Sequence, residues 1–259
     1  MRARRFCRAL LLASVCAIHV SAAAETRPRI AIIIDDLGYE WNAGKRAIGL
    51  PGPVAYAVLP GAPRTAQLAS MAHARGKDVL LHLPLQAQTD PHDEDTGSLL
   101  LDMSMRQFRQ AVGEGIDAVP HAIGVNTHRG SMLTRHPGHM RWLMEEIANH
   151  GDLFFVDSYT TAQSVALRIA REQGLHAARR DVFLDPDRDP ATVVREFARL
   201  KRIASARGFA IGIGHPYAAT LDYLAEALPM LQADGIELVG IRELVLSASG
   251  ERRPTVAAE

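Results

Sequence analysis

The 259-residue sequence predicts a single α/β domain in which parallel strands alternate with helices. From residue 29 onward, short β-branched runs alternate with longer amphipathic stretches, as in repeated βα units. No linker rich in Pro, Gly or Ser divides the chain, and no internal repeat is found. About seven or eight strands in a chain of this length fit a closed or nearly closed (β/α) barrel, with an open doubly wound sheet as the alternative.

The expected strands are residues 30–34, 54–59, 78–83, 122–125, 153–156, 181–184, 209–213 and 237–240, of which 181–184 is the weakest. A dinucleotide fingerprint would favour the doubly wound sheet. It is absent, because Gly212-Ile213-Gly214 is followed by His215-Pro216-Tyr217, where a pyrophosphate turn needs glycine. The barrel is therefore the favoured architecture.

Helices are expected at residues 41–47, 63–75, 104–118, 137–149, 162–173, 190–207 and 218–233. Ser104 is typical of an N-cap, and Pro63, Pro137 and Pro190 are typical of first turns. Only the loop at 89–97 and the tail after Ser247 look irregular. We therefore expect the barrel to span residues 25–247, with an irregular tail at 248–259.

The first 24 residues predict a secretory signal peptide. A basic start precedes an apolar stretch from Ala9 to Val20, and small residues fit cleavage after Ala24. The apolar stretch is shorter than the ~20 residues that a membrane span needs, which disfavours an uncleaved anchor. Cys7 and Cys16 both lie in this segment, so the mature chain has no disulfide and no cysteine ligand. We expect a periplasmic or secreted protein without stable membrane insertion.

The net charge and the absence of certain motifs disfavour several classes of function. Formal net charge is zero and no run of like charges stands out, which disfavours a nucleic-acid partner. The sequence contains no Gly-x-Ser-x-Gly elbow and no His-Glu-x-x-His helix, which disfavours a serine hydrolase and a zincin.

Polar residues that carry chemistry fall at the carboxyl ends of the predicted strands. In a parallel barrel these ends share one rim, where barrel enzymes place their sites. Each residue alone could be a turn residue, a helix cap or a structural histidine. Their shared rim favours one site, made of Asp35, Asp36, His82, Asn126, His128, Asp157 and His215. The other histidines are expected in helices, before strands or in the irregular loop.

One carboxylate and two imidazoles suit Zn²⁺ or a similar divalent ion. Asp36, His82 and His128 are the best candidates for these ligands. Asp35 could then accept the proton of a metal-activated water, and His215 could protonate the leaving group. Asp157 could orient or tune His215.

Five segments together resemble the divergent polysaccharide deacetylases, a secreted offshoot of the metal-dependent polysaccharide deacetylase superfamily. In chain order they are Ile32-Ile33-Ile34-Asp35-Asp36-Leu37-Gly38, Leu81-His82-Leu83-Pro84-Leu85, Gly124-Val125-Asn126-Thr127-His128-Arg129-Gly130-Ser131, Phe155-Val156-Asp157-Ser158 and Gly212-Ile213-Gly214-His215-Pro216. The resemblance implies a distorted, incomplete (β/α) barrel.

It also implies roles for particular residues. Asp35 is similar to the superfamily's base, Asp36 to its carboxylate ligand, and His215 to its catalytic histidine. His82 resembles the first histidine of the His-x-x-x-His motif, but the second falls on Gln86, a poor metal ligand. His128 is the expected replacement. The superfamily's Arg-Pro-Pro-Tyr motif has no counterpart, and Asn126 or Arg129 could fill part of its place in binding substrate.

Two functions remain open on these grounds. The first is a periplasmic deacetylase that uses metal-activated water to remove N- or O-acetyl groups from an acetylated polysaccharide or a peptidoglycan-type glycan. The second is a non-catalytic glycan-binding or envelope-regulating protein that retains the fold. The Asp35-Asp36 pair and His215 favour the enzyme, whereas Gln86 and the scarcity of aromatic residues favour the binding protein.

Overall fold

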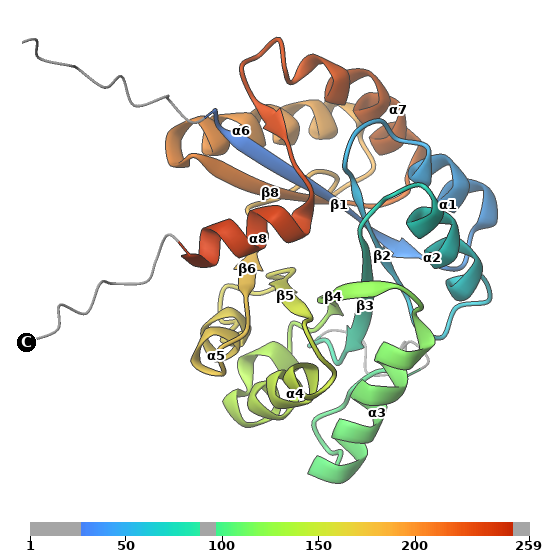
Figure 1. The fold of residues 1–259 in the computed structure, drawn as a ribbon, viewed down its shortest axis with the longest axis vertical. Coiled ribbons are helices and arrows are strands. Elements are labelled where there is room, and N and C mark those ends of the chain that lie inside the picture. Colours follow the sequence, from blue (N-terminus) through green and yellow to red (C-terminus); the bar gives the residue numbers. More distant parts are fainter. Residues whose placement is uncertain (1–26, 89–96, 251–259) are drawn as a thin grey trace, which may run out of the picture.

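The computed structural model describes residues 27–88 and 97–250, and the predicted signal peptide lies outside this part of the chain. Within it, parallel strands form one curled sheet in the order β6-β5-β4-β3-β2-β1-β8-β7, with β9 paired to β1 (Figure 1). The strands are β1 (Arg29–Leu37), β2 (Ala55–Val58), β3 (Val79–Leu85), β4 (Ala122–Arg129), β5 (Phe154–Asp157), β6 (Ala177–Arg179), β7 (Val182–Phe183), β8 (Phe209–Gly214) and β9 (Glu237–Leu238). Because β6 and β7 lie at opposite ends of this order, the barrel is incomplete, which confirms the predicted fold class.

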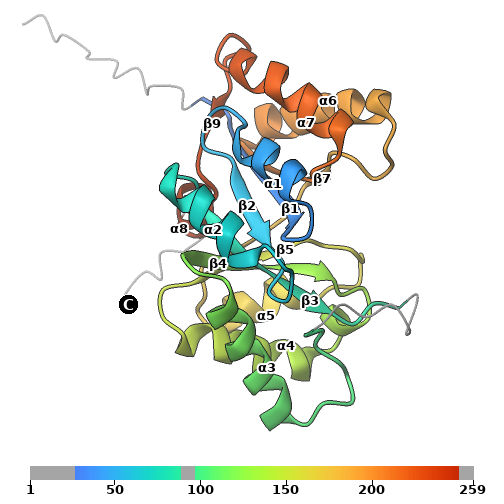
Figure 2. The same cartoon turned by 90° about the vertical axis from the view of Figure 1, so that its right-hand side faces the viewer.

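The helices lie around the curled sheet, most of them on its outside (Figure 2). They are α1 (Trp41–Ile48), α2 (Thr65–Ala74), α3 (Met105–Ala118), α4 (Pro137–Asn149), α5 (Ala166–Glu172), α6 (Pro190–Arg207), α7 (Ala218–Ala227) and α8 (Ile241–Gly250), with short 3₁₀ turns at Leu133–Arg135 and Leu228–Met230. Ser104 forms a capping box with Gln107 at the start of α3, as its sequence position predicts. In the described part of the chain, no helix is long and apolar enough to cross a membrane.

Side-chain alternation along the strands separates two apolar layers. On β1, Ile30, Ile32 and Ile34 pack against the surrounding helices. Ala31 and Ile33 face the barrel interior. This period of two decides which polar residues enter the interior at the carboxyl ends of the strands.

Helix α8 closes the interior at the amino ends of the strands. Its residues Ile241, Leu244 and Val245 belong to the interior apolar cluster. The Arg242 backbone N–H also donates to the carboxylate of Asp78, which immediately precedes β3. The sequence predicted neither α8 nor β6. The prediction of an irregular tail from residue 248 is wrong for residues 248–250, which are helical.

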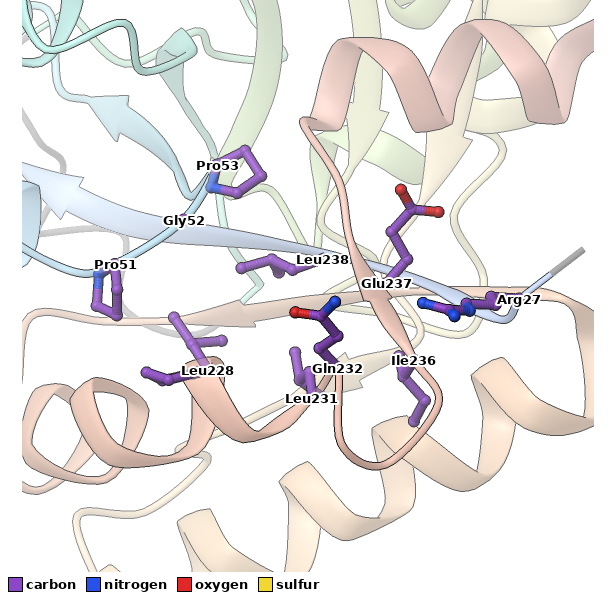
Figure 3. Close-up of a pocket in the computed structure, with 11 residues that line it drawn as sticks. Arg27, Pro51, Gly52, Pro53, Leu228, Leu231, Gln232, Ile236, Glu237 and Leu238 are labelled. Carbon is purple, nitrogen blue, oxygen red and sulfur yellow. The ribbon is translucent and has the colours of Figure 1, made fainter.

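A cavity of ≈ 610 Å³ also opens near the amino end of β1 (Figure 3). Pro51, Pro53, Leu231 and Leu238 are among its lining residues. Leu238 pairs with Ile30 at the beginning of β1, so this cavity lies at the opposite end of that strand from Asp35 and Asp36.

Candidate functional site

A bulge at the end of β1 turns two consecutive carboxylates toward the interior. Ile34 and Leu37 both face the helices, and the pairing register with β2 shifts between them. Asp36 accommodates the extra residue with a φ of 60°. Aspartate tolerates this left-handed conformation better than most residues do, and non-glycine residues held there often mark functional sites. The bulge therefore explains how Asp35 and Asp36 share one site.

Asp36, His82 and His128 bring three potential ligand atoms together. Oδ1 of Asp36 lies 3.1 Å from Nε2 of His82 and 3.0 Å from Nδ1 of His128. The two imidazole nitrogens are themselves 3.0 Å apart. Metal–ligand bonds of about 2.0–2.2 Å place neighbouring ligand atoms roughly 3 Å apart, so this triangle fits a divalent ion. We call these three residues the ligand triangle.

The contacts of Asp36 support the same interpretation. Its Oδ1 is buried and lacks a hydrogen bond of good geometry in the described part of the chain, although two imidazole nitrogens are close to it. Burial alone would raise the pKa of Asp36, but His128 and His82 hold it well below the usual range. The carboxylate is thus kept ionised, as a metal ligand must be.

Asn126 connects the ligand triangle to Asp35. Its side-chain nitrogen donates to Oδ1 of Asp35 at 2.7 Å, and its Oδ1 lies 2.8 Å from Nδ1 of His82. With the amide nitrogen directed at Asp35, the amide oxygen accepts the proton on Nδ1, which leaves the lone pair of His82 on Nε2. The predicted substrate contact of Asn126 disagrees with its complete burial. Asn126 instead contacts His82 and Asp35.

Asp35 lies directly behind the triangle. The residue is 2% exposed, and its Oδ2 is 3.7 Å from Nε2 of His82. Burial raises the pKa of Asp35 despite the opposing effects of His82 and His215. A carboxylate whose pKa is raised is a better proton acceptor than an ordinary one.

His215 is held by Asp185, a residue that the sequence analysis missed. Nδ1 of His215 lies 2.8 Å from one oxygen of Asp185, and the other oxygen accepts the His215 backbone N–H at 2.7 Å. Nε2 then faces Asp36, at 3.8 Å from its Oδ2. Burial alone would lower the pKa of His215, but the hydrogen bond to Asp185 and nearby carboxylates raise it.

The predicted pairing of Asp157 with His215 is therefore wrong. Along β5, Asp157 follows the outward alternation of Phe155, and it accepts from Ser164 Oγ and from the Tyr159 backbone N–H, each at 2.8 Å. Burial raises the pKa of Asp157. Asp185 directly follows the weak predicted strand at 181–184. The strand-end position that identified the other residues could therefore have identified it too.

Two further positions from the sequence analysis lie beside this site. Oε1 of Gln86 accepts the Leu101 backbone N–H at 2.9 Å, so the side chain holds the segment after the 89–96 gap. Arg129 ends β4 with a φ of 55°, and its carbonyl accepts from Thr160. Its expected contact with substrate stays a prediction.

Several other histidines make local contacts apart from the triangle. The exposed rings of His73 and His121 stack on each other at 4.0 Å, and His139 bonds to the Leu101 carbonyl. His150 lies beside Glu146 at the end of α4. His92 lies outside the described residues. Within the described part of the chain, these histidines do not form a second cluster of potential metal ligands.

Comparisons with known proteins agree with this fold. Residues 32–245 match the family described as divergent polysaccharide deacetylase. An uncharacterized protein of Haemophilus influenzae is 38% identical over 216 residues, which cover 83% of this chain and 76% of that protein. The crystal structure of Agrobacterium tumefaciens protein ATU2773 has a TM-score of 0.81 at 23% identity, covering 86% of this chain and 91% of that one. A structure of T48 deacetylase with substrate has a TM-score of 0.55 at 13% identity, covering 86% and 92%. The two structural likenesses concern the fold.

Proposed function

This chain belongs to the divergent polysaccharide deacetylase family, and we propose that it is a metal-dependent hydrolase that removes acetyl groups from a glycan outside the cytoplasm. The ligand triangle carries this proposal. An aspartate and two histidines gather ligand atoms at separations that a divalent ion requires, with Asp35 behind them and His215 in front.

Asp36, His82 and His128 would hold the ion, and their one oxygen and two nitrogens favour Zn²⁺. An ion bound there would supply Lewis acidity, which polarises the acetyl carbonyl and makes water a stronger acid. The carboxamide of Asn126 keeps the lone pair of His82 directed at this position.

Asp35 and His215 would divide the proton transfers between them. Oδ1 of Asp35 is held by Asn126, while Oδ2 faces the triangle and can accept the proton that water loses as it attacks the acetyl carbon. Asp185 fixes Nδ1 of His215, so Nε2 can protonate the departing nitrogen or oxygen as its bond to the acetyl carbon breaks.

Acetate release from defined glycans tests the proposed activity. We expect the mature protein, loaded with Zn²⁺, to release acetate from a peptidoglycan-type or chitin-type oligomer, and to stop when the ion is removed by a chelator. Restored release on adding Zn²⁺ back excludes damage by the chelator. Tight glycan binding without acetate release under all these conditions would instead favour the non-catalytic binding protein.

The cellular location is part of the same proposal. It rests on residues 1–24, whose basic, apolar and small-residue order is typical of a cleaved signal. We expect mature protein beginning at Glu25 in the periplasmic fraction or the medium. Full-length protein found only in the cytoplasm would contradict this expectation.

A further inference from the structure

Five side chains, His215 among them, are linked by successive stacking contacts. The guanidinium of Arg180 lies 3.5 Å from the Phe183 ring centroid, and that ring lies 6.0 Å from the ring of His215. The His215 ring lies 5.4 Å from the ring of Tyr217, over which the Arg188 guanidinium lies at 4.5 Å. We call Arg180, Phe183, His215, Tyr217 and Arg188 the arginine–aromatic stack.

The two arginines of the stack differ in what their donors contact. Arg180 is half-buried, and its Nε and Nη2 donate to the carbonyls of Ser158 and Tyr159 at 2.6 and 2.8 Å. Arg188 is exposed and stacks on Tyr217, but it makes no hydrogen bond or ion pair within the described part of the chain. Arg180 therefore supports the stack, whereas the guanidinium donors of Arg188 remain available.

The acidic neighbours of Arg188 do not neutralise it directly. Asp187 accepts from Thr192 and from the Asp189 backbone N–H, and Asp189 accepts from the Ala191 backbone N–H at the start of α6. Both carboxylates are thus occupied at the amino end of that helix, where negative charge is favourable. The guanidinium is left directed over an aromatic ring rather than toward an acidic side chain.

From this arrangement, and resting on the proposed deacetylase function, we propose that the substrate is an acidic glycan whose carboxylate binds Arg188. A planar guanidinium matches a carboxylate through two parallel hydrogen bonds, and its stacking on an aromatic ring preorganises it. A single available guanidinium suits a singly charged carboxylate. Tyr217 contacts both this guanidinium and the ring of His215, so the carboxylate would lie close to the sugar that carries the acetyl group.

Binding of three oligosaccharides to the Zn²⁺-loaded mature protein tests the inference. The first is a peptidoglycan tetrasaccharide with lactyl carboxylates, the second is the same compound with its carboxylates converted to amides, and the third is a neutral chitin-type tetramer. We expect the parent to bind the carboxylate form about tenfold or more tightly than the amide form, as for a charge-assisted hydrogen bond. This preference should weaken as salt increases.

Variants identify the residue responsible. Arg188→Gln should abolish the preference for the carboxylate form while leaving the Kd of the neutral tetramer unchanged. Arg188→Lys should keep only part of the preference, because an ammonium lacks the planar fork. Arg141→Gln on α4, an exposed arginine elsewhere on the surface, is the matched control and should bind like the parent.

Equal binding of the carboxylate and amide forms by the parent would overturn the inference, as would no measurable binding of the carboxylate form. Equal weakening of all three ligands by Arg188→Gln would do the same. Acetate release is measured in parallel and reports on the proposed function separately. A carboxylate preference that depends on Arg188, without any acetate release, would support the acidic-glycan site. It would contradict the proposed hydrolase function.

Discussion

The side-chain nitrogen of Asn126 donates to Oδ1 of Asp35 across 2.7 Å, joining β4 to β1 behind the ligand triangle. The same carboxamide accepts from Nδ1 of His82. One buried side chain therefore controls both the lone pair of a proposed metal ligand and the position of the proposed base.

Two substitutions at Asn126 should separate these tasks. Asn126→Asp keeps an acceptor for His82 but removes the donor to Asp35, so Zn²⁺ should stay bound while turnover falls. Asn126→Leu removes both contacts and should also weaken Zn²⁺ binding by about 10–100-fold, as losing the hydrogen-bond partner of a metal ligand does. Chelator competition measures the binding of Zn²⁺, and acetate release measures turnover.

Asn149→Asp, an exposed change at the end of α4, is the control and should alter neither quantity. Parent-like values for Asn126→Leu would refute the positioning role of Asn126.

The adjacent carboxylates of β1 should have different roles. Asp35→Asn should retain the metal but lower turnover by roughly 10²–10⁴-fold, the range typical of removing a positioned general base. Asp36→Asn should lose both metal and turnover. Metal content and acetate release of the two variants, beside the parent, check this. Unchanged activity in Asp35→Asn would eliminate the hydrolytic mechanism.

His128 and Gln86 test the replacement of a metal ligand. His128→Ala should bind Zn²⁺ much more weakly, because it removes one corner of the triangle. Gln86→Ala should keep the affinity of the parent, because its Oε1 bonds to the Leu101 backbone and its loss should affect that local segment. Metal affinity and thermal unfolding are the measurements. A strong loss of Zn²⁺ binding in Gln86→Ala, without a loss of stability, would show that the ligands have been misassigned.

Asp185 and Asp157 should affect the pH profile differently. Asp185→Asn removes the carboxylate that raises the pKa of His215, so this pKa falls and protonated His215 is lost at a lower pH. The alkaline limb of the kcat profile should therefore move to lower pH. Asp157→Asn should leave that limb in place and lower only thermal stability, because its contacts are to Ser164 and Tyr159. An equal shift in both variants would argue against the pairing of Asp185 with His215.

Zn²⁺ binding should itself depend on pH. In the metal-free protein, burial alone would lower the pKa of His82, but Asp35 and Asp36 raise it to about 9. Below that pH the ion must displace a proton, so its apparent affinity should rise about tenfold per pH unit and level off above the pKa. Calorimetry in buffers of different ionisation enthalpy should detect close to one proton released per ion at neutral pH. Binding that is independent of pH, with no proton release, would contradict this prediction.

The alternation of strand-like and helix-like segments was sufficient to predict the parallel fold. The polar residues at the predicted strand ends were sufficient to predict most members of the candidate site. The strand at 30–34 and its polar end, for example, follow from an apolar run that stops at Asp35. The bulge could not be predicted, because a run of isoleucines followed by two aspartates does not reveal which residue leaves the regular register. Asp157 was misassigned because a position at the rim does not tell whether the side chain points into the barrel or toward the helices. Outward alternation from Phe155 directs its carboxylate to the helix side.

Short elements were missed for a different reason. Ala177–Arg179 contains few residues typical of strands, and it extends the sheet through pairing with β5. Helix α8 has few turn or cap signals, and its position follows from the open amino end of the barrel, which Ile241, Leu244 and Val245 fill. Tertiary packing, rather than local sequence preference, therefore determines both β6 and α8.

The incomplete barrel has a consequence for how the proposed acid and base keep their spacing. With β6 and β7 at opposite ends of the strand order, β8 is joined to the strands that carry the ligand triangle through β1. Six residue pairs from Arg29↔Phe209 to Ile34↔Gly214 set that alignment, one residue short of both Asp35 and His215. A slip of one residue would move His215 along the strand by about 3.3 Å and reverse the facing of every side chain on β8. The β1–β8 register thus sets the distance between the proposed acid and the proposed base. Substitutions far from the rim that loosen this pairing would change that distance without altering any polar group of the site.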